Sequence, residues 1–281
     1  MQMCGRYFSA HDIDWIRDQV DRLPDLTRIQ LSRLFCQNAG WTKPDGGLKE
    51  MSCRVAMLRL ERAGLIRLPK PRTRPAPVKT IGRTVHGEPR PPVVIDAGAP
   101  LAIVPVERNT SALWNELIDR YHYLGYRRMG GAQMRFFVHA GGQCVALLGF
   151  SAAAWRVAPR DAFIGWSQAQ RKANLHLVVD NSRFLILPWI QSRNLASRIL
   201  ARAARMLPDA WQTRYRYRPV LLETFVETPR FTGTCYQAAN WTCVGRTLGR
   251  GKWDRRHVAD KPVKTVWLYP LQRRSTEALC R

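Results

Sequence analysis

The stretch LILPWIQSRNLASRIL at residues 185–200 combines residue types that could bind an anion. An apolar run that ends at Pro188 is typical of a strand, and apolar residues at helical spacing resume at Leu195. The residues between them, from Gln191 to Asn194, are mostly polar. The first turn of a helix presents free backbone N–H groups and the positive end of the helix dipole, and both favour a phosphate. The alternatives are a phosphate-binding turn and an ordinary strand-to-helix turn in a packed core.

Acidic residues are scarce, with 21 Asp and Glu among 281 residues, so each one is a candidate for chemistry. Asp161, Glu223 and the pair Asp180 and Asn181 could hold the metal ion of a nuclease. However, no paired-carboxylate motif such as D-x-D accompanies them, and Asp161 follows an arginine with which it can pair. The seven cysteines and six histidines are scattered without a CxxC pair, which argues against a disulfide framework and a structural zinc site. A structural role is therefore favoured for these acids, and no metal site is predicted.

The charge of the chain is strongly positive. It carries 45 Lys and Arg against 21 Asp and Glu, a formal net charge of +24. Such a surplus attracts polyanions, because phosphate contacts release condensed counterions. No apolar run is long enough for a transmembrane helix, no basic amphipathic helix suggests a membrane surface, and the N-terminus lacks the apolar core of a secretory signal. We therefore expect a cytoplasmic, nucleoid-associated protein that binds double-stranded DNA and no membrane.

Residues 1–68 have the pattern of a small helical DNA-binding domain. Helical spacing predicts helices over 12–22 and 27–41, the second with Thr27 as its N-cap. A third helix is expected within 48–69; it ends at Gly64, before the short strand LIRLP. This order of elements is that of a winged helix-turn-helix domain, whose third helix enters the major groove.

The third helix is expected to bury one apolar face and to present cations elsewhere. The expected apolar residues are Met51, Val55, Leu58 and Leu60. The expected DNA contacts are Lys49, Arg54 and Arg59, and Arg62 adds positive charge. The alternative is a small helical domain with a solvated basic face.

Residues 69–100 are predicted to form a proline-rich basic linker. Seven prolines lie within 69–92, and proline keeps a chain extended and removes backbone donors. Residues 272–281 are expected to form a basic tail.

Residues 101–271 predict a mixed α/β domain whose first half is antiparallel. A helix over 112–125 precedes a hairpin of strands 134–140 and 144–155. The later elements are expected in the order helix 167–174, strand 183–189, helix 193–207, strand 219–226, helix 232–241, and strands 242–247 and 264–271.

Basic residues of this domain are the further candidates for DNA contact. The segment GRTLGRGKWDRRH at 245–257 is typical of a flexible basic loop and is the best candidate for a nucleic-acid clamp. Arg171, Arg183 and Arg193 are expected around the turn at 191–197, where they could bind phosphates. The predicted DNA contacts of the domain are Arg171, Arg183, Arg246, Arg250, Lys252, Arg255 and Arg256.

Three tryptophans leave two interpretations open. Trp155, Trp166 and Trp189 either pack against the sheet or line a pocket that stacks an extruded base.

The order of elements in 101–271 resembles the GCN5-related N-acetyltransferase fold. Enzymes of that family follow their fourth strand with a pyrophosphate loop of the form Q/R-x-x-G-x-G/A. The residues Gln191, Ser192, Arg193, Asn194, Leu195 and Ala196 fit this form, except that Asn194 replaces a glycine. Asparagine tolerates the left-handed backbone conformation, so the turn can survive. The resemblance implies acyl-CoA as a cofactor, held by Gln191, Ser192, Arg193, Asn194, Ala196 and Ser197.

The same resemblance assigns two catalytic candidates. The segment GTCYQAANWTCVG resembles the final element of that fold, and Tyr236 matches the tyrosine that often protonates the departing thiolate. Glu223, on the preceding strand, suits a general base for an amine. The alternative is that both residues belong to the packed core.

A second resemblance covers nearly the whole chain. The blocks LSRLFCQNAGW, LERAGLIRLP, NLHLVVDNSRFLILPW and LLETFVETPRFTGTCYQAANW are similar, in the same order, to the Druantia anti-phage system protein A family. That family is linked to phage defence and mobile elements. The resemblance implies other defence or transposase subunits as partners, and a DNA-binding protein whose acetyltransferase-like domain modifies nucleic acid or a partner. A non-catalytic DNA-binding subunit and a metal-dependent nuclease are the alternatives.

Overall fold

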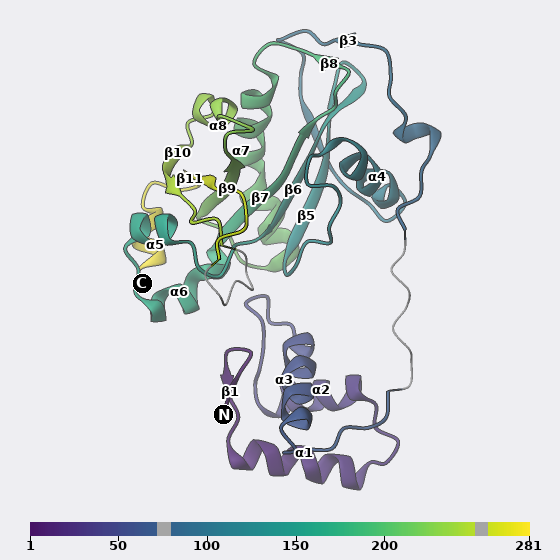
Figure 1. The fold of residues 1–281 in the computed structure, drawn as a ribbon, viewed down its shortest axis with the longest axis vertical. Coiled ribbons are helices and arrows are strands. Elements are labelled where there is room, and N and C mark those ends of the chain that lie inside the picture. Colours follow the sequence, from purple (N-terminus) through teal and green to yellow (C-terminus); the bar gives the residue numbers. More distant parts are fainter. Residues whose placement is uncertain (72–79, 251–257) are drawn as a thin grey trace. The chain divides into compact units, whose positions relative to one another are not determined.

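The computed structural model describes residues 1–71, 80–250 and 258–281 (Figure 1). The chain divides into two compact units, residues 1–79 and 80–281. Among the described residues, no helix is long and apolar enough to cross a membrane.

The first unit contains three helices over a small apolar core. A hairpin of β1 (Gln2–Met3) and β2 (Arg6–Tyr7) precedes α1 (Ala10–Arg22), α2 (Arg28–Asn38) and α3 (Glu50–Arg62). Capping boxes at Ser9 and Thr27 satisfy the first free N–H groups of α1 and α2,. The predicted N-cap at Thr27 is therefore confirmed.

The buried face of α3 differs from the predicted one. Met51 is 64% exposed and Val55 is 39% exposed, so the prediction that they face the core was wrong. The buried residues are Cys53, Ala56, Met57 and Leu60. Both sets have helical spacing, but the small side chains of Cys53 and Ala56 let α2 approach closely.

The segment after α3 forms no strand among the described residues, so the short strand predicted at LIRLP is not present. Instead Ile66 and Leu68 are buried in the helical core, and the Leu68 N–H donates to Glu61 at 3.0 Å. Side-chain burial holds this segment without a sheet partner.

The second unit is built on a seven-stranded mixed sheet. Its strands are β4 (Ala102–Pro105), β5 (Gln133–Ala140), β6 (Gln143–Ala152), β7 (Val178–Ile186), β9 (Leu221–Glu227), β10 (Thr242–Arg246) and β11 (Lys264–Pro270). Their order is β10-β11-β9-β7-β6-β5-β4, and only β7 and β9 pair in parallel. The predicted mixed α/β class with an antiparallel first half is confirmed. The predicted strand 183–189 begins five residues earlier than expected, at Val178, and ends at Ile186.

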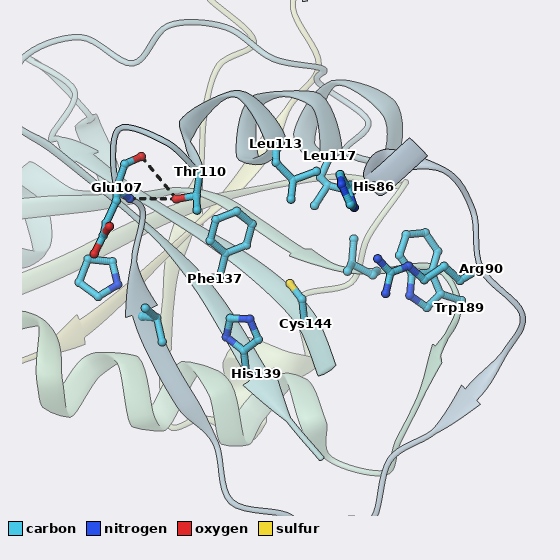
Figure 2. Close-up of a pocket in the computed structure, with 13 residues that line it drawn as sticks. His86, Arg90, Glu107, Thr110, Leu113, Leu117, Phe137, His139, Cys144 and Trp189 are labelled. Carbon is cyan, nitrogen blue, oxygen red and sulfur yellow. Dashed lines mark hydrogen bonds between the residues drawn. The ribbon is translucent and has the colours of Figure 1, made fainter. Parts of the chain in front are cut away.

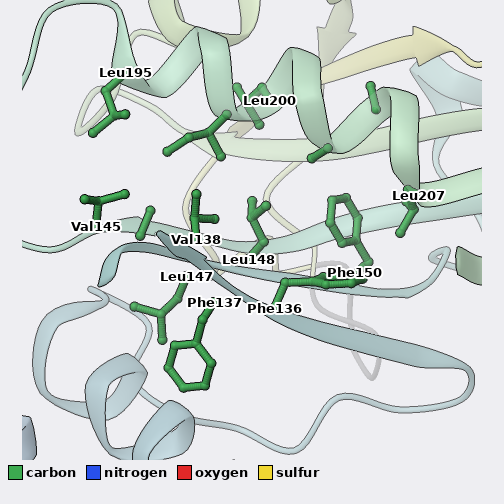
Figure 3. Packing of buried hydrophobic residues seen from close by; sticks show 14 of the residues in the cluster. Phe136, Phe137, Val138, Val145, Leu147, Leu148, Phe150, Leu195, Leu200 and Leu207 are labelled. Carbon is green, nitrogen blue, oxygen red and sulfur yellow. The ribbon is translucent and has the colours of Figure 1, made fainter. Parts of the chain in front are cut away.

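Helices cover both faces of this sheet. They are α4 (Ser111–Tyr121), α5 (Ala158–Ile164), α6 (Gln168–Asn174), α7 (Leu195–Tyr215), α8 (Thr234–Ala238) and α9 (Ser275–Leu279), with 3-10 turns η1 (Val85–Gly87) and η2 (Leu175–Leu177). Figure 3 shows Val138, Leu148 and Phe150 on the side of the sheet that faces α7, and Phe137 and Leu147 on the opposite side. This alternation is the period-two pattern of the strand sequences.

Helix α7 is longer than predicted, because it continues through Pro208 to Tyr215. Two aromatic residues anchor its last turns. Trp211 is fully buried, and the Tyr215 hydroxyl accepts from the N–H of Gln133 at 2.7 Å and donates to its carbonyl at 2.8 Å. This tertiary packing overrides the preference of proline against helix interiors.

The central strands separate after a short parallel ladder. Val178, Val179 and Asp180 pair with Leu221, Leu222 and Glu223, and no pairing follows. Glu223 points to the face of the sheet that carries α5, and its neighbour Thr224 points to the face that carries α8.

Residues 80–100, predicted as part of the linker, belong to the second unit and pack against its other elements. The buried carboxylate of Glu116 accepts from the N–H and the hydroxyl of Thr84, both at 2.7 Å. Strand β3 (Val93–Val94) pairs in parallel with β8 (Ile190–Gln191). The C-terminal residues also fold back, since Leu279 is fully buried and its carbonyl accepts from Asn174 at 3.1 Å.

Candidate functional site

A broad groove of about 1840 Å³ lies on the second unit. Its walls come from the ends of β6, β9 and β10, from the start of β11 and from the segment after α4. Of the residues that the structure describes, seven cationic side chains and one acidic side chain, Glu227, line it. The cations are Arg127, Arg156, Arg183, Arg246, Arg250, Lys261 and Lys264.

Within the described parts of the chain, most of these cations have no acidic partner. Among the described residues, only Lys261 of the seven forms an ion pair, with Asp260 at 2.9 Å. Unpaired cations along a concave surface produce a positive field that concentrates anions. The groove therefore has the charge and the size to hold a phosphate backbone.

One wall of the groove is held by a buried ion pair below it. Arg160 Nη1 lies 2.8 Å from Glu223 Oε2, and both side chains are fully buried. Glu223 also accepts from the N–H of Ala154 at 2.9 Å, and Arg160 donates to the carbonyl of Ala154 at 2.8 Å. The pair thus fixes both backbone groups of a residue that lines the groove.

Asp161 connects this pair to an exposed tryptophan. Its carboxylate accepts from Arg160 at 2.8 Å, from Trp166 Nε1 at 3.1 Å and from Arg171 at 3.1 Å. The guanidinium of Arg171 in turn lies 5.6 Å from the ring centre of Trp155. Trp166 is therefore a core residue, whereas Trp155 lines the groove and is 57% exposed.

The electrostatics of Glu223 fit a structural role better than that of a free base. Burial raises the pKa of Glu223, and the charge of Arg160 and the Ala154 N–H oppose this shift,. Both carboxylate oxygens already accept hydrogen bonds. A general base needs a free oxygen that faces the substrate.

Asp180, which pairs with Glu223 across the strands, differs from Glu223 in its hydrogen bonding. Its Oδ1 is buried and has no hydrogen-bond partner among the described residues. Burial and the nearby charge of Glu223 raise the pKa of Asp180 well above its usual range. Arg183, which lines the groove, has a buried Nε that also lacks a partner.

Tyr236 lies on the other face of the sheet from Glu223. Its hydroxyl donates to Asn181 Oδ1 at 2.9 Å and accepts from the Thr224 hydroxyl at 3.5 Å. Its ring packs against Trp241, with ring centres 5.1 Å apart. Burial raises the pKa of Tyr236. The structure therefore does not bring the two predicted catalytic residues together.

The turn at 191–196 has the features expected of an anion site. Asn194 adopts the left-handed conformation with φ of 56°, in agreement with the prediction that asparagine preserves the turn. The Ser192 hydroxyl oxygen and Arg198 Nη1 are buried without a hydrogen-bond partner among the described residues. Arg198 Nη2 donates to the carbonyl of Ala99 at 2.6 Å, which fixes its guanidinium. Ser192 belongs to the turn, and Arg198 lies at the start of the 21-residue helix α7.

The predicted DNA contacts fall into several places. Lys49, Arg54 and Arg59 belong to the first unit, where Arg59 is exposed on α3. Arg183, Arg246 and Arg250 line the groove. Arg171 is held by Asp161 at 3.1 Å and does not line the groove. Lys252, Arg255 and Arg256 lie outside the described residues.

The sequence did not predict four of the groove cations, Arg127, Arg156, Lys261 and Lys264. One signal was available for Arg156, since it follows Trp155 at the end of a predicted strand. An aromatic residue beside a cation at a strand end is typical of nucleic-acid contacts. The other three are isolated in sequence from recognisable motifs.

A smaller cavity of about 240 Å³ lies between α4 and the edge of the sheet. Figure 2 shows Leu113 and Leu117 above it, with Phe137, His139 and Cys144 on the strands below. Burial raises the pKa of the Cys144 thiol to about 11, so this thiol is protonated at neutral pH. Neither this cavity nor the groove is lined by the turn at 191–196.

Comparison with protein families gives one match. The family model described as Druantia protein DruA matches residues 90–261, more than half of the chain. No curated protein sequence matches the chain.

Solved structures with a similar chain path include acetyltransferases. The ribosomal-protein-S18-alanine N-acetyltransferase from Escherichia coli has 10% identity and a TM-score of 0.37, covering 62% of this chain and 95% of that chain. An acetyltransferase of the GNAT family from Streptococcus pneumoniae has 11% identity and a TM-score of 0.40, with coverages of 62% and 100%. The aminoglycoside acetyltransferase AAC(6')-Ib, in complex with coenzyme A and kanamycin, has 10% identity and a TM-score of 0.39, with coverages of 64% and 98%.

Proposed function

The chain belongs to the family described as Druantia protein DruA, and from this membership we propose that it is a DNA-binding protein of an anti-phage defence system. The observation that carries the proposal is the groove of the second unit, which seven cations and one acid line. Phosphate contacts of this kind supply most of the affinity of DNA-binding proteins. Other subunits of the defence system are the expected protein partners.

The predicted winged helix-turn-helix pattern lacks its strand after α3 among the described residues, so the first unit is proposed to contact duplex DNA as a helix-turn-helix domain. Helix α3 supports this, because it exposes Met51, Val55, Arg59 and Arg62. These residues follow helical spacing, so they form one stripe along the helix. A stripe of cationic and apolar side chains suits phosphates and base edges in a major groove.

Salt dependence of binding tests the proposal. The affinity of the full chain for a fluorescent 30-base-pair duplex is measured by anisotropy at several salt concentrations. We expect log K to fall linearly with log salt, with a slope of about 0.9 per phosphate contact. The double variant Arg246→Gln, Arg250→Gln, tested with this duplex and with one of its strands, should lower the slope for the nucleic acid that occupies the groove by about two contacts. Salt-independent binding, or no binding, would refute the proposed function.

A matched control is available on α7. Arg202 and Arg205 are exposed and do not line the groove. The double variant Arg202→Gln, Arg205→Gln removes the same charge from the same unit, so an equal loss of slope would show that the groove has no special role.

Acyl transfer is the second candidate function, and the turn at 191–196 supports it. The Ser192 hydroxyl and Arg198 Nη1, both buried and without a hydrogen-bond partner in the described parts of the chain, fit the diphosphate of an acyl-CoA, together with the start of α7. Bound there, such a cofactor would supply an activated acyl group. Both carboxylate oxygens of Glu223 already accept hydrogen bonds, so neither is free to deprotonate an acyl acceptor. This favours a non-catalytic DNA-binding subunit over an enzyme.

Titration calorimetry with acetyl-CoA and with free CoA distinguishes an acyl-CoA site from a structural turn. If the turn holds the diphosphate, both ligands bind, and Ala196→Tyr, which crowds the turn, abolishes binding while Arg202→Gln does not. If neither ligand binds a chain that still binds DNA, the turn is structural and the acyl-transfer candidate is lost.

A further inference from the structure

An exposed aromatic side chain, Trp155, lines the groove, and a second, Phe231, lies beside it, because the Phe231 N–H donates to the carbonyl of the groove residue Glu227 at 2.9 Å. In the second unit, Trp155 is 57% exposed and lines the groove. Phe231 is 44% exposed. Its ring centre lies 5.1 Å from that of Tyr123, which precedes the groove residue Leu124. Aromatic rings beside a cationic groove can stack on the bases of a nucleic acid whose phosphates the cations hold.

Arginine side chains fix both aromatic groups in place. Trp155 lies 5.6 Å from the guanidinium of Arg171, which Asp161 holds in turn at 3.1 Å. At the other group, the Arg230 guanidinium lies 4.9 Å from the ring centre of Tyr123 and 5.7 Å from that of Phe231. Each ring is therefore preorganised and still exposed, so that little conformational entropy is lost when a planar ligand stacks on it.

The group around Tyr123 borders the cationic lining of the groove. His122 stacks on Tyr123, with ring centres 4.9 Å apart. Burial lowers the pKa of His122 to about 4, and the charges of Arg183, Lys264 and Arg230 add to the shift. Arg183 and Lys264 line the groove. Phosphates held by these two cations would thus lie beside the aromatic group.

We propose that the groove binds an unpaired nucleic-acid strand, whose phosphates contact the cations and whose bases stack on Trp155 and Phe231. This inference rests on the proposed function and narrows its substrate for the second unit. A cationic groove with stacking side chains is the general solution for single strands. In a duplex the bases are stacked on each other, so exposed aromatic rings would find no free base faces.

The test compares single strands with a duplex on the full chain. Anisotropy gives the affinities for a 20-nucleotide DNA strand, the RNA strand of the same sequence and the DNA duplex. Trp155→Ala and Phe231→Ala should each weaken single-strand binding by roughly 5- to 150-fold, the range for loss of one stacked base. Duplex affinity should remain unchanged, and Trp155→Phe should restore most of the lost affinity. Comparison of the two single-strand affinities shows whether the groove prefers DNA or RNA.

A control variant and the melting temperatures of all variants distinguish the possible outcomes. Phe163 is 47% exposed, does not line the groove and, among the described residues, does not belong to the aromatic group of Tyr123 and Phe231 beside it, so Phe163→Ala should change nothing. Melting temperatures confirm that each variant is folded. If Arg246→Gln, Arg250→Gln weakens binding but Trp155→Ala and Phe231→Ala do not, the stacking proposal is overturned and the proposed function stands. If the wild-type chain binds neither strand nor duplex, both fail.

Discussion

The two cationic surfaces of this molecule are built in different ways. On α3, a single helix supplies the exposed residues Met51, Val55, Arg59 and Arg62. In the groove, the seven cations come from five separate segments between Arg127 and Lys264. The first surface needs only a folded helix, whereas the second exists only when the strands and loops of the second unit are assembled.

Because the groove is assembled from separate segments, its structure depends on contacts between residues that are far apart in the chain. Its wall at Ala154 depends on the buried pair of Arg160 and Glu223, which are 63 positions apart in the chain. In the described part of the first unit, no fully buried ion pair lies under the exposed stripe of α3, whose core is apolar. Perturbation of buried charge should therefore damage the groove and leave the surface of α3 intact.

The largest effect is expected from Glu223→Ala. Removal of the carboxylate leaves the fully buried Arg160 without its partner across the strands, and loss of one member of such a pair costs about 3–5 kcal/mol. Hydrogen exchange measured by mass spectrometry should show loss of protection in β6, α5 and β9. Protection of α1–α3 should be unchanged.

The control for this variant is Asp209→Ala. Asp209 pairs with Arg218, but the two side chains are 74% and 50% exposed, so the expected loss of stability is below about 1 kcal/mol. A comparably small effect of Glu223→Ala would mean that the pair does not hold the groove wall.

Local signals predicted much of the fold. The hairpin of β5 and β6 follows from two alternating apolar runs around Gly141 and Gly142, both with positive φ,. Tertiary packing determined the features of the fold that local sequence signals left ambiguous. The apolar face of α3 was ambiguous because two stripes have helical spacing, and α7 passes through Pro208 because Trp211 and Tyr215 pack beyond it.

The candidate site was predictable only in part. Arg246 and Arg250 stand in a segment of glycine and arginine that suggests a basic loop, so sequence alone indicated them. Lys264 begins an apolar strand and became a groove residue only through the position of β11. The partner of Glu223 could not be inferred, because Arg160 reaches it through tertiary packing.

A smaller effect is expected when a single cation is removed from α3. Arg59→Gln should lower the salt slope of duplex binding by about one contact, because Arg59 is exposed on α3. Binding of a single strand should not change, since the groove belongs to the other unit. Anisotropy titrations with both ligands measure this, and an equal loss for strand and duplex would show that the two surfaces do not divide the ligands between them.

The smallest effect near neutral pH, and the most specific to the groove, is expected at His122. Burial and nearby cations lower its pKa from 6.5 to about 4 in the folded state. The unfolded chain therefore binds a proton at higher pH than the folded chain, so the stabilising effect is present above pH 6.5 and is lost as the pH falls toward 4. Phosphates that neutralise Arg183 and Lys264 should raise this pKa, because they remove the charges that disfavour a protonated imidazole. Titration of the imidazole by NMR, without and with a 20-nucleotide strand, measures both values. The variant His86→Gln removes the signal of a different histidine and serves as the control for assigning the imidazole resonances. An unchanged pKa of His122 in the complex would place the phosphates away from this end of the groove.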